Sequence, residues 1–275
     1  MLPTRLALPA LLLCTLSAAP AVAQGSMEIV VNIPAGRLDV LQGGTRVRSF
    51  PVSVGTAAHA TPTAEASVRR VVWNPTWTPP DAPWARKEKP AGPGWNNPMG
   101  RVKMHLFRDY YVHGTPARNE ARLGRPASHG CIRMRNADVV ELARLVMDAD
   151  GAPLSAAQVD RLAANPGATH EVALSGRVRV RVEYRLTEVT DDSLVLLPDV
   201  YARHRGGYAA RVAEELRAAG HDPAPVLATL AAATAPTAPL RMARDARGVR
   251  LLPLPQIRLA MPAADAAPAT RLALQ

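Results

Sequence analysis

The sequence contains few cysteines and few aromatic residues, and each shortage narrows the kind of protein it can encode. Two cysteines, Cys14 and Cys131, occur in 275 residues, and phenylalanine, tryptophan and tyrosine together make up 4% of the chain. Because aromatic residues are few and many of the 26 prolines fall in the last third, we expect the folded part to be concentrated towards the front of the chain. No C-x-x-C or H-E-x-x-H pair is present, so the common short spacings of zinc ligands are absent.

Long apolar runs are also missing, except at the N-terminus. There Arg5 precedes an apolar run over residues 6–16 and a small-x-small site at residues 21–23. This pattern is typical of a cleaved secretory signal peptide, and the run is too short for a permanent membrane span. We therefore expect residues 1–23 to be a signal peptide and the protein to be exported. An uncleaved anchor and a lipoprotein processed at Cys14 are the alternatives.

Removal of residues 1–23 leaves Cys131 as the sole cysteine, so no intramolecular disulfide can form. A free thiol in an oxidising compartment is a liability unless it is buried or has a chemical role. Residues 128–134 read SHGCIRM, and His113-Gly114-Thr115 lies upstream. A thiol nucleophile needs a neighbouring imidazolium or helix N-terminus to lower its pKa. The two histidines therefore favour a reactive cysteine over a structural one.

Either histidine is a candidate base for this thiol. His129 lies two residues before Cys131, and such side chains share a face of an extended segment. His113 is joined to Cys131 by a stretch containing glycine and proline, which we expect to be a loop that brings the two together. Gly130 has no Cβ, so a substrate backbone can approach it and nearby N–H groups can stabilise an oxyanion. A zinc site made by the three side chains is the alternative, although paired ligand spacing is absent.

The segment YVHGTPARNEARLGRPASHGCIRMRNADVVEL, residues 111–142, resembles the catalytic core of L,D-transpeptidases of the YkuD family. In that family a histidine lies upstream of Ser/Thr-His-Gly-Cys, and here 14 residues separate His113 from Ser128. The resemblance extends upstream to VVWNPTWTPP and GPGWNNPMGRVKMHL, and downstream to about residue 202. It is strongest to the Gram-negative periplasmic branch, in which Arg133 is common where other members have asparagine.

The resemblance implies a periplasmic cysteine transferase that acts in peptidoglycan biosynthesis, cell-wall organisation and cell shape. It implies that Cys131 attacks the third residue of a tetrapeptide stem and forms a thioester, while His113 takes the thiol proton. It also implies sensitivity to carbapenems at that thiol. The other residues that the resemblance assigns to the oxyanion, to the shape of the site and to substrate binding are Gly130, His129, Ser128, Gly114, Arg133 and Thr115.

No metal or organic cofactor is implied by the resemblance. The acceptor amine can belong to another stem, a protein or a free D-amino acid, and the sequence does not choose among them. A thiol hydrolase of the same family, either an L,D-carboxypeptidase or an amidase, would use the same residues with water as acceptor. A wall-binding module with a vestigial site is a further alternative, although an intact set of histidines and cysteine argues against it.

Local patterns predict a mostly β fold with a few helices, and the resemblance implies a β-sandwich-like catalytic domain over residues 26–205. Gly43-Gly44 is typical of a two-residue hairpin turn, and residues 178–186 alternate as a half-buried antiparallel strand does. Asn136 is expected to cap a helix over residues 137–148. Ser155 and Gln158 match a capping box that opens a second helix.

Beyond residue 206 the composition changes. Residues 208–220 are expected to form one helix, and the rest of the chain to residue 275 is rich in alanine and proline without clear periodicity. Such a sequence buries little apolar surface, so we expect a flexible or loosely docked tail that is dispensable for fold and chemistry.

The net charge of the chain is +10. Nucleic acid is not an expected partner, because the protein is expected to be exported and the arginines are scattered without stacking aromatics. The positive charge instead suits the carboxylates of peptidoglycan stem peptides.

Overall fold

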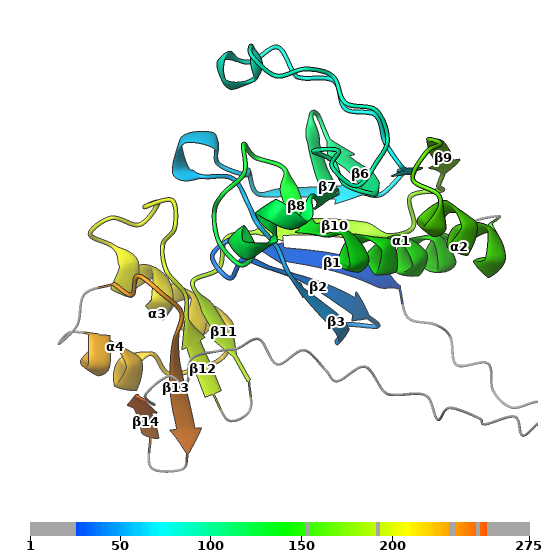
Figure 1. Ribbon diagram of the computed structural model, residues 1–275. Coiled ribbons are helices and arrows are strands. Elements are labelled where there is room, and N and C mark those ends of the chain that lie inside the picture. Colours follow the sequence, from blue (N-terminus) through cyan, green and yellow to red (C-terminus); the bar gives the residue numbers. More distant parts are fainter. Residues whose placement is uncertain (1–25, 152–153, 191–192, 231–234, 246–247, 252–275) are drawn as a thin grey trace, which may run out of the picture.

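A computed structural model of the chain describes residues 26–151, 154–190, 193–230, 235–245 and 248–251. The expected signal peptide, residues 1–23, lies outside the described residues. Most of the described secondary structure is β, and it is accompanied by a few helices, which confirms the predicted fold class. The strands form three sheets (Figure 1).

The first sheet has five strands in the order β3-β2-β1-β10-β4. They are β1 (Met27–Asn32), β2 (Arg37–Gln42), β3 (Thr45–Pro51), β4 (Ala64–Ser67) and β10 (Arg179–Glu183). Gly43 and Gly44 join β2 to β3 at φ values of 56° and 81°, and so form the predicted hairpin turn. β10 pairs antiparallel with β4, as expected, but its other neighbour, β1, runs parallel to it.

The second sheet has the order β8-β7-β6-β5-β9. Its strands are β5 (Arg70–Trp73), β6 (Val102–Phe107), β7 (Tyr110–Thr115), β8 (Ile132–Arg135) and β9 (His170–Ala173). β7 and β8 are parallel, and the connection between them contains a short 3-10 helix, η3 (Ala117–Arg122). The residues Met104, Val112 and Ile132 are buried on one face of this sheet. Because strand side chains alternate, the other face of β7 and β8 carries the polar residues of the site.

Helix α1 (Asn136–Asp150) packs against β6, β7 and β8, and its buried stripe joins the apolar faces of both sheets in one core. Asn136 is part of this helix and does not cap it, which corrects the prediction. Its Oδ1 instead accepts a hydrogen bond from the Arg101 backbone N–H at 2.9 Å. Helix α2 (Ala156–Ala164) begins with the predicted capping box of Ser155 and Gln158.

The third sheet has the order β11-β12-β13-β14 and, with two helices, forms a C-terminal unit at the lower left of Figure 1. Its strands are β11 (Thr187–Val189), β12 (Ser193–Leu196), β13 (Leu240–Asp245) and β14 (Gly248–Leu251). Its helices are α3 (Tyr208–Ala218), which was predicted, and α4 (Ala224–Leu230), which was not. None of the helices in the described ranges combines the length and apolar character needed to cross a bilayer.

The sequence after residue 220 is therefore more structured than its composition suggested. β13 pairs antiparallel with β12, and Met242 on β13 is fully buried. Pairing between strands depends on residues that are distant in sequence, so local periodicity did not predict β13 and β14. The remaining stretch of the expected tail, residues 252–275, lies outside the described residues.

Candidate active site

His113 and Cys131 come from neighbouring parallel strands. His113 lies on β7, and Cys131 directly precedes β8. The register pairs Val112 with Ile132 and His113 with Arg133. Since Val112 and Ile132 point into the core, the alternation of strand side chains puts His113 and Arg133 on the opposite face. Cys131 lies at a bend two residues before Arg133 and directly before β8, next to that face.

The imidazole of His113 is held in one orientation by its own neighbour. Its Nδ1 lies 2.6 Å from the Gly114 carbonyl oxygen, so Nδ1–H donates there and Nε2 is left with a free lone pair. The residue is buried, and burial lowers the pKa of His113 to about 3, with the charges of Arg133 and Lys103 acting in the same direction. The ring is therefore neutral at neutral pH, which is the form that accepts a proton.

The thiol of Cys131 is half-buried and lies 3.5 Å from the Asp109 carbonyl oxygen, to which it donates. Burial raises the pKa of the Cys131 thiol, and the Tyr111 backbone N–H and the charge of Arg133 only partly oppose this. The expectation that an imidazolium lowers this pKa is therefore corrected. The resting pair is a protonated thiol and a neutral imidazole.

Ser128 fixes the loop that carries the cysteine. Its hydroxyl donates to the Cys131 carbonyl oxygen at 2.6 Å and accepts from the Gly130 N–H at 3.0 Å. The Gly130 N–H is thus already hydrogen-bonded to Ser128, whereas the sequence analysis expected it to be free to stabilise an oxyanion. Gly130 has a φ of +114°, and an added Cβ would lie 2.9 Å from Cε1 of Tyr110. Its role in this structure is to let the loop pass Tyr110.

Thr61 and Tyr201, which the sequence analysis did not single out, hold the cysteine loop in place through hydrogen bonds. The Thr61 hydroxyl donates to the Gly130 carbonyl oxygen at 2.7 Å and accepts from the Gly55 N–H at 2.8 Å. The Tyr201 hydroxyl donates to the Gly55 carbonyl oxygen at 2.8 Å and accepts from the Thr61 N–H at 3.1 Å. Thr61 lies 69 positions from Gly130 and 140 positions from Tyr201 in the sequence, so no local pattern could have connected them.

His129 has different surroundings from His113. Its ring is exposed and stacks on Trp84 with centroids 4.0 Å apart and planes within 2°, and it lies 4.9 Å from the ring of His59. Trp84 belongs to the long loop between β5 and β6, drawn in cyan at the top of Figure 1. His129 therefore contacts this loop, and His113 is the histidine on the strand face of Cys131.

The two arms of that long loop are the segments VVWNPTWTPP and GPGWNNPMG. Trp77 and Ala91 form an antiparallel bridge between the arms. The Asn97 side-chain amide closes the base by donating to the carbonyl oxygens of Pro75 and Gly92 at 2.9 and 2.8 Å. The tryptophans and asparagines of these segments thus shape the loop that reaches His129.

The two expected substrate-binding residues differ in their access to solvent. Arg133 is half-buried, and its Nη1 donates to the Ala127 carbonyl oxygen at 3.3 Å. Thr115 is fully buried, and its hydroxyl has no hydrogen-bond partner among the described residues. Thr115 thus lies in the protein interior at the end of β7. Among the described residues, no three His, Cys, Asp or Glu side chains gather where they could hold a metal ion.

Comparisons with known proteins point to one family. The family model for the L,D-transpeptidase catalytic domain, YkuD, matches residues 26–170. The chain is 37% identical over 124 residues to the probable L,D-transpeptidase ErfK/SrfK of Escherichia coli K12, covering 40% of this chain and 38% of that protein. It is 32% identical over 120 residues to the putative L,D-transpeptidase YkuD of Bacillus subtilis, covering 43% of this chain and 60% of that protein.

Solved structures give a weaker likeness. An L,D-transpeptidase from Mycobacterium smegmatis is 16% identical with a TM-score of 0.37, and the alignment covers 57% of this chain and 58% of that one. The catalytic domain of the Enterococcus faecium L,D-transpeptidase is 13% identical with a TM-score of 0.38, covering 58% of this chain and 99% of that one.

The aligned region is thus about two fifths to three fifths of the length of these curated relatives. The family match, by contrast, spans more than half of this chain and contains both His113 and Cys131. The chain belongs to the L,D-transpeptidase catalytic domain family.

Proposed function

We propose that this protein is an exported, periplasmic L,D-transpeptidase that acts on the tetrapeptide stems of peptidoglycan through a thioester at Cys131. The observation that supports the proposal is that His113 on β7 lies beside β8, the parallel strand that Cys131 directly precedes. His113 is neutral, and its Nδ1 is occupied by the Gly114 carbonyl oxygen. Its Nε2 is therefore available to take a proton from a thiol.

In the acylation step, Nε2 of His113 removes the thiol proton as Sγ of Cys131 bonds to the carbonyl carbon of the third stem residue. The C–N bond to the terminal D-alanine then breaks, and the departing amine receives the proton from the imidazolium. The carbonyl oxygen carries negative charge in between, and we assign its stabilisation to the backbone N–H of Cys131. One such donor contributes about 3 kcal/mol in other acyl-transfer enzymes.

In the transfer step, an acceptor amine attacks the thioester carbon and gives a proton to His113. The new amide forms as the C–S bond breaks, and the imidazolium returns the proton to Sγ. The acceptor can be the side-chain amine of a second stem, a protein amine or a free D-amino acid. No metal or organic cofactor enters either step.

Arg133 is the best candidate for holding a substrate carboxylate. It lies beside His113 in the strand register and is half-buried on the same face. A guanidinium presents paired N–H donors that match a carboxylate. Thr115 is proposed to support β7 beside the histidine, while Ser128 and Gly130 shape the loop and His129 shapes its rim with Trp84.

The proposal is tested by incubating the chain from residue 26 onwards with muropeptides that carry tetrapeptide stems. Mass spectrometry should detect loss of D-alanine together with a cross-linked or amine-exchanged product. A carbapenem should add once to the protein, at Cys131. The variant Cys131→Ala should lose the product and the adduct and keep its circular dichroism spectrum, because it removes one sulfur atom and leaves a small cavity.

The outcomes separate the competing functions. Cleaved stems without any amine-exchanged product would identify a thiol hydrolase that uses water as acceptor. Binding of muropeptides without turnover would indicate a wall-binding module. Full turnover by Cys131→Ala would contradict the proposed nucleophile.

A further inference from the structure

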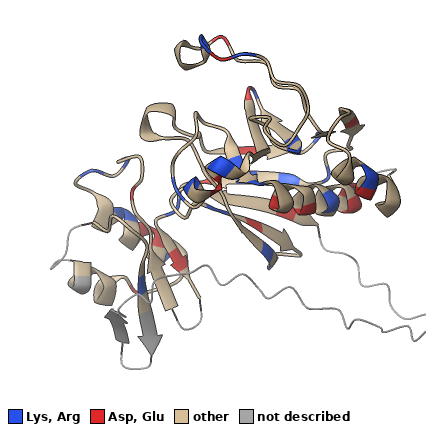
Figure 2. Ribbon diagram, in the orientation of Figure 1, with Lys and Arg blue, Asp and Glu red and all other residues tan. Residues whose placement is uncertain are grey.

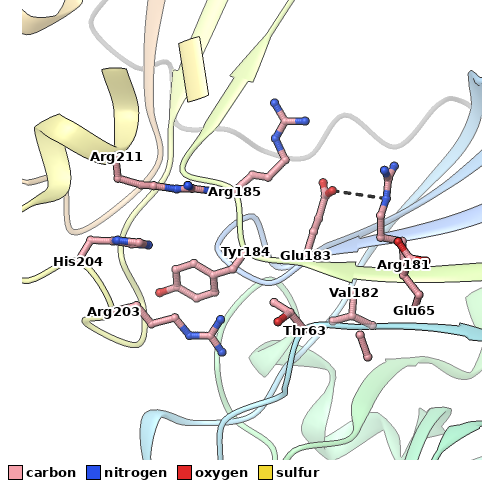
Figure 3. A pocket seen from close by; sticks show the side chains of 11 residues that line it. Thr63, Glu65, Arg181, Val182, Glu183, Tyr184, Arg185, Arg203, His204 and Arg211 are labelled. Carbon is pink, nitrogen blue, oxygen red and sulfur yellow. Dashed lines mark ion pairs between the residues drawn. The ribbon is translucent and has the colours of Figure 1, made fainter. Parts of the chain in front are cut away.

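The C-terminal unit and the first sheet enclose a cleft that contains none of the residues assigned to the active site. Its volume is about 640 Å³. One wall comes from the end of β10 and from residues 63–65 at the start of β4. The other comes from Arg203, His204 and Arg211, before and within α3 (Figure 3). Six charged side chains that line it are Arg181, Arg185, Arg203, Arg211, Glu65 and Glu183.

Two of the four arginines are already committed to carboxylates. Arg211 donates to Glu214 at 2.9 Å and to Glu215 at 3.0 Å. Arg181 lies 3.6 Å from Glu183, an ion pair drawn as a dashed line in Figure 3. Both guanidinium groups thus already lie beside carboxylates of this chain.

The other two arginines are available to a ligand. The guanidinium of Arg185 is exposed and makes no hydrogen bond or ion pair with any described residue. The guanidinium of Arg203 lies over the Tyr184 ring at 4.4 Å, which occupies its face and leaves its N–H edge free. Tyr184 itself is buried, and Figure 3 draws its ring beside Arg203, whereas the Arg185 side chain points away from that ring. The cleft is thus lined by two guanidinium groups that form no ion pair with a carboxylate among the described residues.

Carboxylates beside these arginines argue against a polyphosphate or another polyanion as the ligand. Glu65 is exposed at the edge of the cleft, and Glu183 lines it. In Figure 2 positive and negative positions are interspersed along the chain in both units. A ligand that carries both carboxylates and an amine satisfies the arginines and the glutamates together.

We propose that this cleft binds an acidic peptide that carries at least two carboxylates and a free amine. Arg185 and Arg203 each take a carboxylate, and Glu65 faces the amine. Peptidoglycan stems have this chemistry, so identifying the ligand as a second stem rests on the proposed function, whereas the cleft's preference for such a peptide does not.

The cleft is also connected to the cysteine loop. The Tyr184 hydroxyl donates to Asp199 at 2.6 Å and accepts from the Tyr201 N–H at 2.8 Å. The Tyr201 hydroxyl in turn forms hydrogen bonds with Gly55 and Thr61, which hold the cysteine loop in place. A peptide held by Arg203, whose guanidinium lies over the Tyr184 ring, is therefore linked through Tyr184 and Tyr201 to the residues that hold the cysteine loop.

The test uses the chain from residue 26 onwards with Cys131→Ala, so that binding is measured without turnover. The probe is the tetrapeptide L-alanyl-γ-D-glutamyl-meso-diaminopimelyl-D-alanine with a photoreactive diazirine on the first alanine side chain. After irradiation, mass spectrometry should locate cross-links on residues 181–185 and 203–211. Arg185→Gln and Arg203→Gln should each weaken binding at this cleft about fivefold, the effect of losing one exposed charge pair.

Arg205→Gln is the matched control, because Arg205 is an exposed arginine near Arg203 that does not line the cleft. It should leave binding unchanged, and amidation of the peptide carboxylates should abolish the cleft cross-links. Cross-links confined to residues near position 131, or equal effects of Arg203→Gln and Arg205→Gln, would overturn the inference. So would tighter binding of tripolyphosphate than of the peptide. Cleft binding by a protein without transferase activity would uphold the inference while the proposed function failed.

Discussion

Burial decides the protonation state of both groups at the candidate nucleophile. It raises the pKa of the Cys131 thiol and lowers the pKa of His113 to about 3, because a buried charge loses hydration. Both shifts favour the neutral forms. A thiolate–imidazolium pair is therefore not the resting state, and proton transfer to His113 has to accompany attack on the substrate.

A resting pair of neutral thiol and neutral imidazole predicts a particular pH dependence for alkylation of Cys131. In the chain from residue 26 onwards, where Cys131 is the only thiol, the rate of reaction with iodoacetamide should rise steadily with pH. It should show no inflection near 6.5, the ordinary pKa of histidine, and should still be rising at about pH 8.5, the ordinary pKa of a free thiol. The rate is measured by mass spectrometry at a series of pH values.

Two histidine variants provide the matched comparison for this prediction. His113→Gln should slow acyl transfer by about 100- to 10,000-fold, as expected for loss of a general base, and His129→Gln should slow it much less. A plateau of alkylation below pH 7 would show that an ion pair exists after all. A larger loss with His129→Gln would reassign the base.

At the scale of single elements, local chemistry predicted local structure well. The Gly43-Gly44 turn and the Ser155–Gln158 capping box depend on neighbours in sequence, and both are present. The cap assigned to Asn136 was wrong because its side chain is taken by Arg101, 35 positions away. The parallel pairing of β10 with β1 was also missed because of distance in sequence, since β1 lies about 150 residues earlier.

The cysteine loop depends on one such distant contact, which predicts the effect of changing Thr61. Thr61→Val keeps the side-chain shape but leaves the Gly55 N–H and the Gly130 carbonyl without their partner. We expect a loss of about 1–3 kcal/mol in unfolding free energy, the cost of unpaired buried polar groups. Acylation of Cys131 by a carbapenem should slow by about 10- to 100-fold, because small displacements of a reacting group are costly.

Thr61→Ser is the control, because it retains the hydroxyl and loses one methyl group. It should restore most of the acylation rate. If serine and valine gave equal acylation rates, Thr61 would act by packing alone, and its hydrogen bond to Gly130 would have no positioning role.

For the whole molecule, the sequence motif located the catalytic domain, whereas composition underestimated the chain that follows it. The expectation that everything after residue 206 is dispensable rested on alanine and proline content. In the structure, α3 buries Tyr208, Val212 and Leu216 in the common core. The Tyr208 hydroxyl donates to the Leu197 carbonyl oxygen at 2.8 Å. A chain cut at residue 206 would expose that surface, so we now expect it to be destabilised.

Glu215 on α3 tests this coupling between the C-terminal unit and the rest of the chain. Its buried carboxylate accepts from the backbone N–H groups of Leu186 and Thr187, both at 2.9 Å, and from Arg211 at 3.0 Å. Glu215→Gln removes the charge and one acceptor oxygen. The free energy of unfolding in urea should fall by about 3 kcal/mol, as when a buried charge pair loses one partner.

Glu214→Gln is the matched control for this change. Glu214 pairs with the same Arg211, but its side chain is 69% exposed, so its loss should cost less than about 1 kcal/mol. Unfolding curves for the two variants, followed by circular dichroism, give the comparison. If α3 were a loosely docked appendage, Glu215→Gln would be as mild as Glu214→Gln, because neither carboxylate would then hold the start of β11 in place.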